Sequence, residues 1–562
     1  MNFDVPDTRR RSWFRRLPRR RLVLGAALVV VLAGAYFAFW RGQSLAANLS
    51  QLRGWVSRRQ VLIHLVCCLV AAVLVAWPEK PAGTSRSRRA PTSYKLAAAI
   101  ALLGYYNFGT SFGRHWLHLW EMFHYDLGSK YFPELGYDGL YAASVVAQIK
   151  TSDHPVQHYI RDLRTNQVVL MPTLLDYYNQ VMDRFTVQRW LQFQDDHRVF
   201  LEILGTERQI RLDHGYNPTP TWTFVARLLS ARTPSTRGRL TLLSLVDPLL
   251  LALMWLVLFR TYGSRTACLS IIVFGFAFAS RFYWNGGAFL RLDWIVAVVV
   301  GVCMLNRQRF RAAGALFAYA AMVRVFPVLF LFGPAVVAVR CLVRRESARW
   351  ALHLAQGFAL SALVCFAAGA YTGRGVRAWS ECLGNLHKHH GTWLTNNVGL
   401  ANLVLYDGVT LRRELVDPTL PEPWLHWQEH MDQRQTRLKP LIIVLSLATL
   451  ALIAAAAWRS PPDEAAVLGL GAVYATLLLT CYYWVMLILA PIRSGRAATA
   501  AILVMNAGLY TLDLRGAPYE MLYGLMSWAL AALLLAWMLP GAWRTIRRRG
   551  ADRLPSGVSV SP

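Results

Sequence analysis

Apolar runs long enough to cross a membrane recur along most of the chain, separated by polar or basic turns. A helix of about 20 apolar residues spans a hydrocarbon core of about 30 Å, and many of the runs approach that length. The pattern predicts an all-α polytopic membrane protein, a bundle of about fourteen transmembrane helices with short amphipathic helices in its outer loops. The expected spans lie near residues 21–40, 60–78, 95–113, 239–260, 267–284, 292–306, 312–324, 325–343, 350–371, 439–458, 464–482, 483–495, 496–512 and 520–540.

The distribution of basic residues predicts the orientation of these spans. Basic turns at 79–94 and 307–311, with the arginine-rich ends of the chain, flank apolar runs, and such turns face the cytoplasm. Both termini are therefore expected in the cytoplasm, and the long polar stretches 114–238 and 372–437 on the outer face. The run 21–40 has no small-residue cleavage site, so we interpret it as a retained helix. We expect an integral, multi-pass protein of a bacterial inner (plasma) membrane.

Composition supports this class and excludes others. The chain is 55% hydrophobic and 16% charged, against roughly 25% charged in soluble domains. Its net charge of +29 comes from Lys and Arg that flank apolar runs, so we expect contact with anionic membrane lipids and no nucleic acid. The eight cysteines are scattered without a CxxC pair, which argues against a disulfide framework or a zinc site.

The stretch HLWEMFHYDLGSKYFPELGYDGLY, residues 118–141, concentrates polar side chains just after an apolar run. In a helix, Glu121 has no local ion-pair partner, whereas Asp126 has Lys130 four residues later. One interpretation is an interfacial amphipathic helix whose carboxylates face water. The other makes Glu121 a general base, with Asp126 as the second candidate, because partial desolvation at the membrane exit raises proton affinity.

Two arginines are candidates for binding a phosphate. Arg324 interrupts an apolar run, which costs roughly 2.5–3.5 kcal/mol on insertion scales and marks ligand pathways. Pro327 follows it, so we expect two short helices that meet near the outer leaflet. In NGGAFLRLDW, residues 285–294, Arg291 and Asp293 lie at the mouth between two spans. The alternatives are snorkelling of Arg324 to headgroups and a local Arg291–Asp293 pair that closes a turn.

The stretch GNLHKHHGTWLTNNVGL, residues 384–400, places histidines and amides in the second outer loop. No spaced acid or cysteine completes a metal site there, so a lining for a sugar or phosphate is favoured. The remaining polar side chains of these stretches are expected to bind substrate: His124, Lys130, Tyr131, Asp293, His387, His390, Asn396 and Asn397. Walker, GxSxG, HExxH and dinucleotide motifs are absent from the sequence.

An acidic residue after an early span, an outward-facing cap and many helices together resemble the integral-membrane glycosyltransferases of the GT-C fold. Within that class, AAGALFAYAAMVRVFPVLFLFGP is similar to a stretch of polyprenyl-phosphate-mannose and arabinofuranose transferases (glycosyltransferase family 87 and relatives), where a basic residue precedes Phe-Pro or Tyr-Pro. The overall pattern covers about residues 95–510, and the resemblance implies that the bundle is GT-C-like. The chain departs from many relatives in having a lone Glu in WEMFHYD rather than an adjacent acidic pair.

The resemblance implies transfer of a sugar from a polyprenyl-phosphate donor to a hydroxyl of a glycan or lipid acceptor on the outer face, with inversion. It makes Glu121 or Asp126 the catalytic base, and Arg324 and Arg291 the donor-phosphate ligands. No cofactor is required, and a divalent cation stays open. The domains would be 1–94, a basic tail with two extra helices; 95–540, the catalytic membrane domain; and 541–562, a basic cytoplasmic tail. The alternative function is a transporter or flippase of a lipid-linked sugar, and a membrane scaffold is a third.

Overall fold

The computed structural model describes residues 45–78, 89–112, 116–153, 155–204, 210–389 and 391–551. The chain divides into two compact units, Met1–Gln60 and Val61–Pro562. The described part of the first unit is the beginning of one long helix, α2. The expected span 21–40 lies outside the described residues, and the elements after α2 all belong to the second unit.

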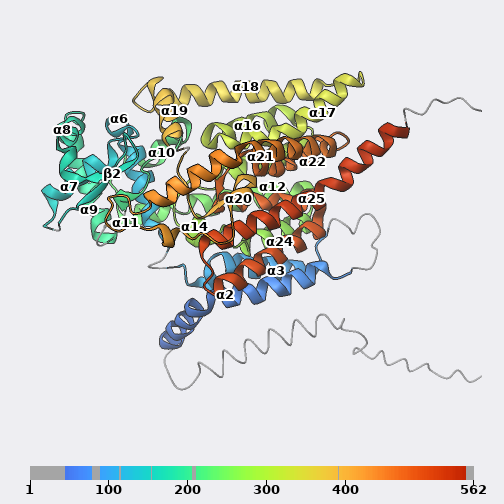
Figure 1. Cartoon of the computed structure of the whole chain (residues 1–562), viewed down its shortest axis with the longest axis horizontal. Coiled ribbons are helices and arrows are strands. Elements are labelled where there is room, and N and C mark those ends of the chain that lie inside the picture. Colours follow the sequence, from blue (N-terminus) through green and yellow to red (C-terminus); the bar gives the residue numbers. More distant parts are fainter. Residues whose placement is uncertain are drawn as a thin grey trace, which may run out of the picture. The chain divides into compact units, whose positions relative to one another are not determined.

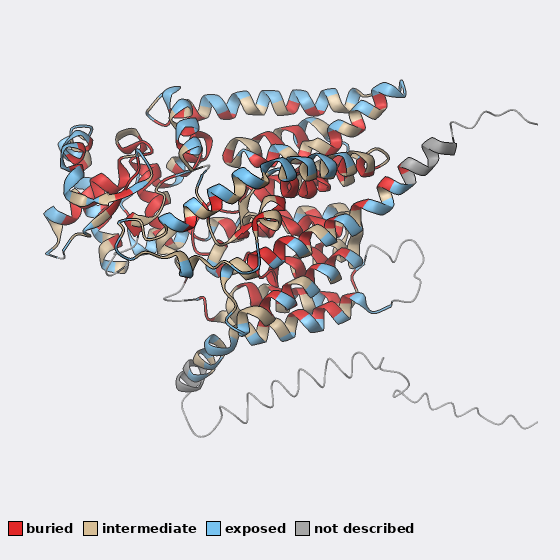
Figure 2. Ribbon diagram, viewed as in Figure 1, coloured by how far each residue is buried: buried red, intermediate tan, exposed pale blue. Residues whose placement is uncertain are grey.

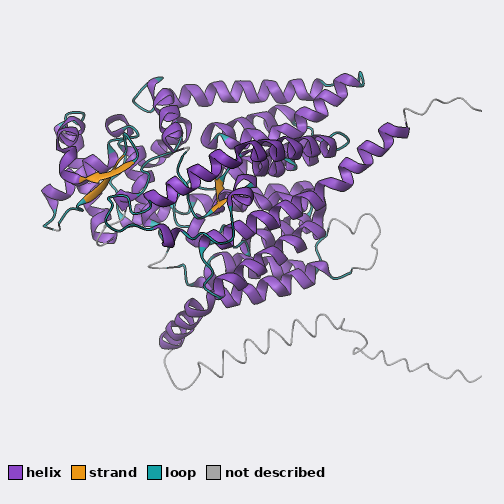
Figure 3. Ribbon diagram, viewed as in Figure 1, coloured by secondary structure: helices purple, strands orange, loops and turns teal. Residues whose placement is uncertain are grey.

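Helices dominate the described chain, and two short antiparallel strand pairs are the sheet that accompanies them (Figure 3). The α-helices are α2 (Leu45–Ala76), α3 (Thr92–Tyr105), α4 (Leu119–Met122), α5 (Gly128–Lys130), α6 (Phe132–Leu135), α7 (Leu140–Thr151), α8 (Leu175–Met182), α9 (Val187–Leu204), α10 (Pro220–Ser230), α11 (Arg237–Leu243), α12 (Val246–Tyr262), α13 (Ser264–Gly275), α14 (Phe282–Asn285), α15 (Asp293–Asn306), α16 (Phe310–Arg324), α17 (Phe332–Val343), α18 (Arg349–Ala370), α19 (Arg377–His389), α20 (Leu400–Leu405), α21 (Leu425–Ala457), α22 (Pro462–Val467), α23 (Gly469–Thr476), α24 (Ala490–Leu514) and α25 (Tyr519–Ala551). The 3-10 helices are η1 (Asn107–Gly109), η4 (Met171–Leu174), η5 (Ile210–Leu212), η6 (Phe326–Leu331), η7 (Arg412–Leu415) and η8 (Cys481–Leu489), and η3 (Phe123–Leu127) is a π-helix. The strands are β1 (Tyr159–Asp162), β2 (Gln167–Leu170), β3 (Asn397–Val398) and β4 (Leu479–Thr480).

Seven helical segments of the described chain are long and apolar enough to cross a membrane: Gln51–Ala76, Arg237–Tyr262, Phe326–Val343, Arg349–Ala370, Leu425–Ala457, Cys481–Leu514 and Tyr519–Trp543. Shorter apolar helices, Ser264–Gly275 and Asp293–Asn306, accompany them. The prediction of an all-α membrane protein is thus supported, whereas the number of about fourteen spans is not reached by these helices. The difference has a local cause, because several expected spans are broken: 464–482 divides into α22, α23 and β4.

The surface of α18 fits a lipid-facing helix. Leu352, Leu360, Leu363 and Val364 are each more than half exposed, and the helix is coloured mainly pale blue and tan (Figure 2). Exposed apolar side chains in such number are costly in water and favourable against acyl chains. Buried residues, drawn red in the same view, are more frequent on the helices that pack inside the unit.

Elements of the two long polar stretches gather at one end of the unit. In Figure 1, α6 to α11 and α19 lie at the left, where α18 ends and α21 begins. The turn between α17 and α18 lies at the opposite end of these helices. The described elements α6 to α11 and α19 of the two stretches therefore lie at the same end of the unit, and we call this assembly the cap.

The cap has structure that the helical patterning of the sequence did not predict. Strands β1 and β2 form a hairpin in which Tyr159 pairs with Leu170 and Asp162 with Gln167. Asn166 adopts the left-handed conformation in its turn (φ 63°), which asparagine tolerates better than most residues. The core beside it is aromatic, with Phe123 and Phe132 fully buried.

Helix breaks place polar side chains where the cap meets the spanning helices. Helix α10 begins at a Thr219 cap, whose hydroxyl accepts a hydrogen bond from the Trp222 N–H, with Pro220 at the first helical position. Helix α16 ends at Arg324 because Val325 has a positive φ of 61° and Pro327 opens η6. The expected interruption of 312–343 is thus observed, and Arg324 lies at it.

Candidate functional site

The loop between α14 and α15 docks tightly against the segment that leads into α4. The His118 N–H donates to the Gly287 carbonyl at 2.9 Å. A Cβ atom on Gly287, which has φ +71°, would lie 2.1 Å from the Trp116 carbonyl oxygen. Only glycine permits this approach and this conformation together. The contact brings the residues after Gly287 alongside the residues after His118.

Glu121 and Arg291 form an ion pair across that contact. The Arg291 side chain is 4% exposed and that of Glu121 22% exposed. Burial is the largest single effect and raises the pKa of Glu121. The charge and hydrogen bond of Arg291, with the charges of His118 and His124, together outweigh it and lower that pKa to about 2. Glu121 is therefore ionised at neutral pH while the pair persists.

The backbone around Arg291 is fixed by a buried carboxylate and a shared carbonyl. Asp247 of α12 accepts hydrogen bonds from the N–H groups of Arg291 (2.9 Å) and Leu292 (3.4 Å). The Leu290 carbonyl accepts from Trp222 Nε1 at 2.8 Å and from Arg324 Nη2 at 3.3 Å. One short loop thus positions both arginines, although they lie on different elements.

A small cavity, lined by both arginines, lies between these groups. The two guanidiniums face aromatic rings: Arg291 Cζ is 5.2 Å from the centre of the Tyr482 ring, and Arg324 Cζ is 5.9 Å from that of Trp222. Such contacts stabilise a cation that has left water. The residues that line the cavity are Tyr125, Asn285, Arg291, Leu292, Trp294, Arg324, Tyr482, Tyr483 and Val485.

Part of the hydrogen-bonding capacity at the site is unused. Among the described residues, Arg324 Nε is buried without a hydrogen-bond partner, and so is Asp293 Oδ1, whose other oxygen accepts from the Tyr319 hydroxyl at 2.9 Å. Buried polar atoms without partners are uncommon in folded proteins. Two positive charges, Arg291 and Arg324, thus line the cavity, and Glu121 is paired with Arg291. This arrangement can bind an anion and hold a carboxylate near it.

Asp126 is not part of this site. It is fully buried, and it accepts hydrogen bonds from Ser235 Oγ at 2.6 Å and from both terminal nitrogens of Arg239. The expected pair with Lys130 is wrong, because Lys130 Nζ lies 2.6 Å from Asp196. Residues Phe123–Leu127 form a π-helix, which has more residues per turn than an α-helix. The angle between the Glu121 and Asp126 side chains therefore differs from the one expected for an α-helix.

Three further predicted substrate-binding residues have structural contacts inside the cap. His124 Nδ1 lies 2.8 Å from the Trp120 carbonyl oxygen, and its Nε2 lies 2.8 Å from the Tyr141 hydroxyl. Lys130 donates to the Thr233 carbonyl. The Tyr131 hydroxyl donates to Asp196 at 2.7 Å. All three are buried, so they hold the cap together and do not face the cavity.

The predicted residues of the second loop separate. His387 is exposed on α19, and His390 lies outside the described residues. Asn396 contacts η8: its carbonyl accepts from the Cys481 N–H at 2.8 Å. Asn397 lines a second pocket. Within the described residues no group of three or more His, Cys, Asp and Glu side chains is arranged to hold a metal ion, and the eight cysteines are free thiols.

Tyr482 and Tyr483 are site residues that the sequence interpretation missed. They follow β4 at the start of η8, and the Tyr482 carbonyl accepts from the Asn285 side chain at 3.2 Å. Adjacent tyrosines at the end of an apolar run were the available signal. Such rings commonly lie at a membrane interface, which gave no reason to single them out.

No protein-family model, no curated protein and no solved structure matches this chain.

Proposed function

We propose that this protein is a membrane glycosyltransferase that moves a sugar from a polyprenyl-phosphate donor to a hydroxyl of a glycan or lipid acceptor. One observation carries the proposal: a half-buried carboxylate, Glu121, is paired with Arg291, which together with Arg324 lines a small cavity where the cap meets apolar helices. A lipid-anchored donor reaches such a position from the bilayer, and a polar acceptor reaches it from the cap.

The two arginines are suited to stabilise the phosphate leaving group. As the bond between the anomeric carbon and the phosphate oxygen breaks, negative charge develops on that oxygen. Guanidiniums that are already in place stabilise it without reorganisation, and they bind phosphate with two donors. Arg324 has no ion pair with a carboxylate among the described residues and keeps an unused donor at Nε, whereas Arg291 is paired with Glu121. Arg291 contributes its charge from the other side of the cavity.

Glu121 is suited to act as the general base, but only once its ion pair with Arg291 is weakened. With a pKa of about 2, it takes a proton from a hydroxyl inefficiently. A donor phosphate near Arg291 competes for the same guanidinium and raises the proton affinity of Glu121. The base then accepts the acceptor's proton, the acceptor oxygen bonds to the anomeric carbon from the face opposite the phosphate, and the configuration inverts.

The experiment is mass spectrometry of lipid-linked sugars and surface glycans from cells that make wild-type or Glu121→Gln protein at equal levels. We expect one polyprenyl-phosphate sugar to accumulate and one glycan linkage to disappear in the variant. Asp195→Asn is the matched control, since that carboxylate is 71% exposed on α9. Unchanged lipids and glycans in the Glu121 variant would contradict transfer by this site. A lipid-linked sugar held on the inner leaflet would instead indicate a transporter.

A further inference from the structure

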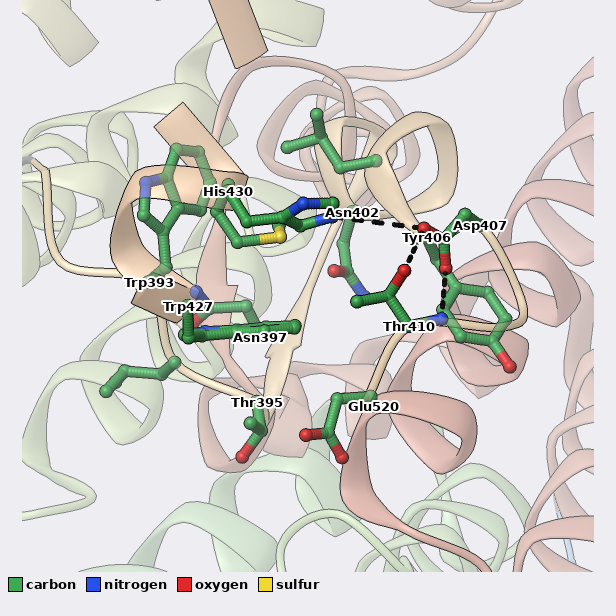
Figure 4. A pocket seen from close by; sticks show the side chains of 13 residues that line it. Trp393, Thr395, Asn397, Asn402, Tyr406, Asp407, Thr410, Trp427, His430 and Glu520 are labelled. Carbon is green, nitrogen blue, oxygen red and sulfur yellow. Dashed lines mark hydrogen bonds and ion pairs between the residues drawn. The ribbon is translucent and has the colours of Figure 1, made fainter. Parts of the chain in front are cut away.

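The pocket that Asn397 lines has room for little besides water (Figure 4). Its volume is about 30 Å³, enough for about one or two water molecules. The dashed lines in Figure 4 include bonds from Thr410 to the Asp407 carboxylate, so that carboxylate is occupied by its own turn. A ligand site has to be sought in a larger hollow.

Such a hollow lies among helix ends at a distance from the cap, and its volume is about 590 Å³. This volume falls within the roughly 300–1,000 Å³ of small-molecule sites. Its walls come from the end of α15, the start of α16, α17, the start of α18 and the turn from α21 to α22. The turn between α17 and α18 lies at the end of these helices away from the cap (Figure 1). We call this hollow the arginine cleft, and the lining residues that matter here are Gln308, Val337, Arg340, Trp350, Arg459 and Asp463.

Two arginines from different elements are neighbours at the cleft. Arg340 of α17 donates through Nη1 to the carbonyl of Trp458 at 3.0 Å, and Arg459 is the next residue. Arg459 is partly exposed, and its guanidinium has no hydrogen bond or ion pair with any residue that the structure describes. The Nε atoms of both arginines are buried, so the terminal nitrogens are the donors that can reach a ligand. Guanidiniums with such donors bind phosphate through paired hydrogen bonds.

The carboxylates near the cleft leave both arginines available. Glu346 lies 3.6 Å from Arg340 and is 46% exposed, and an exposed pair of this kind contributes little. Asp463 is buried. Its Oδ2 accepts from the Tyr262 hydroxyl at 2.7 Å and from the Asn306 side chain at 2.8 Å. Asp463 thus joins helix ends together, and the cleft keeps an excess of positive charge.

The turns around the cleft extend this positive charge. The segments 307–311, 340–349 and 459–464 together contain eight arginines and three carboxylates. Of these carboxylates, Glu464 lies 3.5 Å from a further arginine, Arg493. A basic cluster of this kind attracts anions, and basic pockets between spanning helices bind anionic lipid headgroups.

The surroundings of the arginines favour a lipid over a soluble anion. Trp350 lies in the first turn of α18, the helix whose exposed leucines fit a lipid-facing surface, and tryptophan is enriched where a membrane meets water. Val337 precedes Arg340 by three residues, so the two share a face of α17, and both line the cleft. Val337 is the closer of the two to the middle of the candidate span Phe326–Val343. Cationic donors outside apolar side chains match a phosphate that lies outside its acyl chains.

This combination separates three ligand classes. Free phosphate would use the arginines without the apolar surface beside them. A zwitterionic lipid would bring a second, cationic group toward a basic surface, which repels it. An anionic phospholipid uses the arginines and the apolar surface, and it brings no cation.

We propose that the arginine cleft binds the phosphate of an anionic membrane phospholipid, with Arg459 and Arg340 as its ligands and Trp350 at the level of the headgroup. The proposal does not depend on the proposed function, because the cleft shares no lining residue with the cavity beside Glu121.

Native mass spectrometry of the purified full-length protein in detergent tests the binding. The probes are phosphatidylglycerol, phosphatidylcholine with the same acyl chains, and inorganic phosphate, each titrated separately. We expect the first phosphatidylglycerol to bind about tenfold or more tightly than the first phosphatidylcholine. Inorganic phosphate should not displace it, because phosphate lacks the acyl chains.

Arg459→Gln is the decisive variant. It loses no hydrogen bond or ion pair with a described residue, so it should fold, and its affinity for phosphatidylglycerol should fall about tenfold or more. Arg459→Lys keeps the charge without the paired donors and should bind with an affinity between the two. Arg309→Gln is the matched control, because Arg309 is exposed in the turn before α16 and does not line the cleft. It should weaken binding much less than Arg459→Gln does.

Thermal unfolding of the same proteins gives a second readout. Phosphatidylglycerol should raise the thermal midpoint of wild type and of Arg309→Gln, and raise that of Arg459→Gln less, since a ligand of the folded state stabilises it by mass action. Glu121→Gln should bind the lipid as wild type does while it loses transfer, so the two proposals can fail separately.

Three results would overturn the proposal. The first is equal affinity for phosphatidylglycerol and phosphatidylcholine. The second is an equal effect of Arg459→Gln and Arg309→Gln on lipid affinity and on the rise in thermal midpoint. The third is displacement of the lipid by inorganic phosphate, which would make the cleft a site for the free anion.

Discussion

Replacing Glu121 by Gln removes one partner of the ion pair at the centre of the site. The resulting loss in free energy of unfolding can be worked out in two ways. Arg291 is 4% exposed, and removal of one partner from a buried pair costs about 3–5 kcal/mol. The pKa of Glu121 falls from 4.5 to about 2, and each pH unit corresponds to about 1.36 kcal/mol, roughly 3 kcal/mol in all. The Glu121 side chain keeps 22% of its surface exposed. We therefore expect the free energy of unfolding of Glu121→Gln to fall by about 2–3 kcal/mol, near the lower end of these values.

The pH dependence of this loss has a definite sign. The pKa of Glu121 is lower in the folded protein than in the unfolded chain, so its contribution is complete above about pH 4.5 and disappears as the pH falls toward 2. The difference in free energy of unfolding between wild type and Glu121→Gln should therefore be constant around neutral pH. It should shrink steadily below about pH 4.5.

Detergent-denaturation titrations of purified protein at several pH values measure this difference. Asp195→Asn is the control, because its ion pair with Arg198 is exposed on both sides (71% and 50%), and such pairs contribute about 0–1 kcal/mol. A Glu121→Gln effect as small as the control, or one that does not change between neutral pH and about pH 3, would refute the inference that a buried Arg291 depends on Glu121.

Three further changes test other parts of the structure. Asp126→Asn should lower the free energy of unfolding by about 3–5 kcal/mol, because Arg239 (12% exposed) loses its carboxylate; a stable variant without transfer activity would instead make Asp126 the base. Gly287→Ala should unfold the site or lower the thermal midpoint, since its Cβ would lie 2.1 Å from the Trp116 carbonyl oxygen, and a wild-type melting curve would contradict that contact. Arg324→Lys should reduce kcat/KM for transfer about tenfold, because it keeps the charge and loses the planar donor pair; equal kinetics would exclude a hydrogen-bonding role for the guanidinium.

The membrane class and the position of the cap could be predicted from the sequence, because both depend on local pattern. Apolar run length and the placement of Lys and Arg are read within about 20 residues. The number of membrane-spanning helices was harder to predict. The runs 312–343 and 464–482 contain breaks, and side-chain packing decides whether such a run forms one helix or two short pieces.

The pairing of charges could not be predicted, since it joins residues that are distant in the chain. Glu121 has no partner at helical spacing, but the loop that Gly287 docks brings Arg291 to it. Asp126 does have Lys130 at the right spacing, yet a buried Asp196 binds that lysine. Sequence spacing describes which pairs a helix permits, whereas tertiary contacts decide which are formed.

The central claim is that Glu121 acts as the base in sugar transfer from a polyprenyl phosphate. The most direct measurement is transfer by purified protein in lipid nanodiscs, with lipid-linked sugars and acceptor glycans extracted from host cells and the products identified by mass spectrometry. We expect a new glycosidic linkage with wild type and with Asp195→Asn, and a rate about a hundredfold lower with folded Glu121→Gln. Transfer at the wild-type rate by Glu121→Gln, or no transfer by any of the three proteins, would contradict the claim.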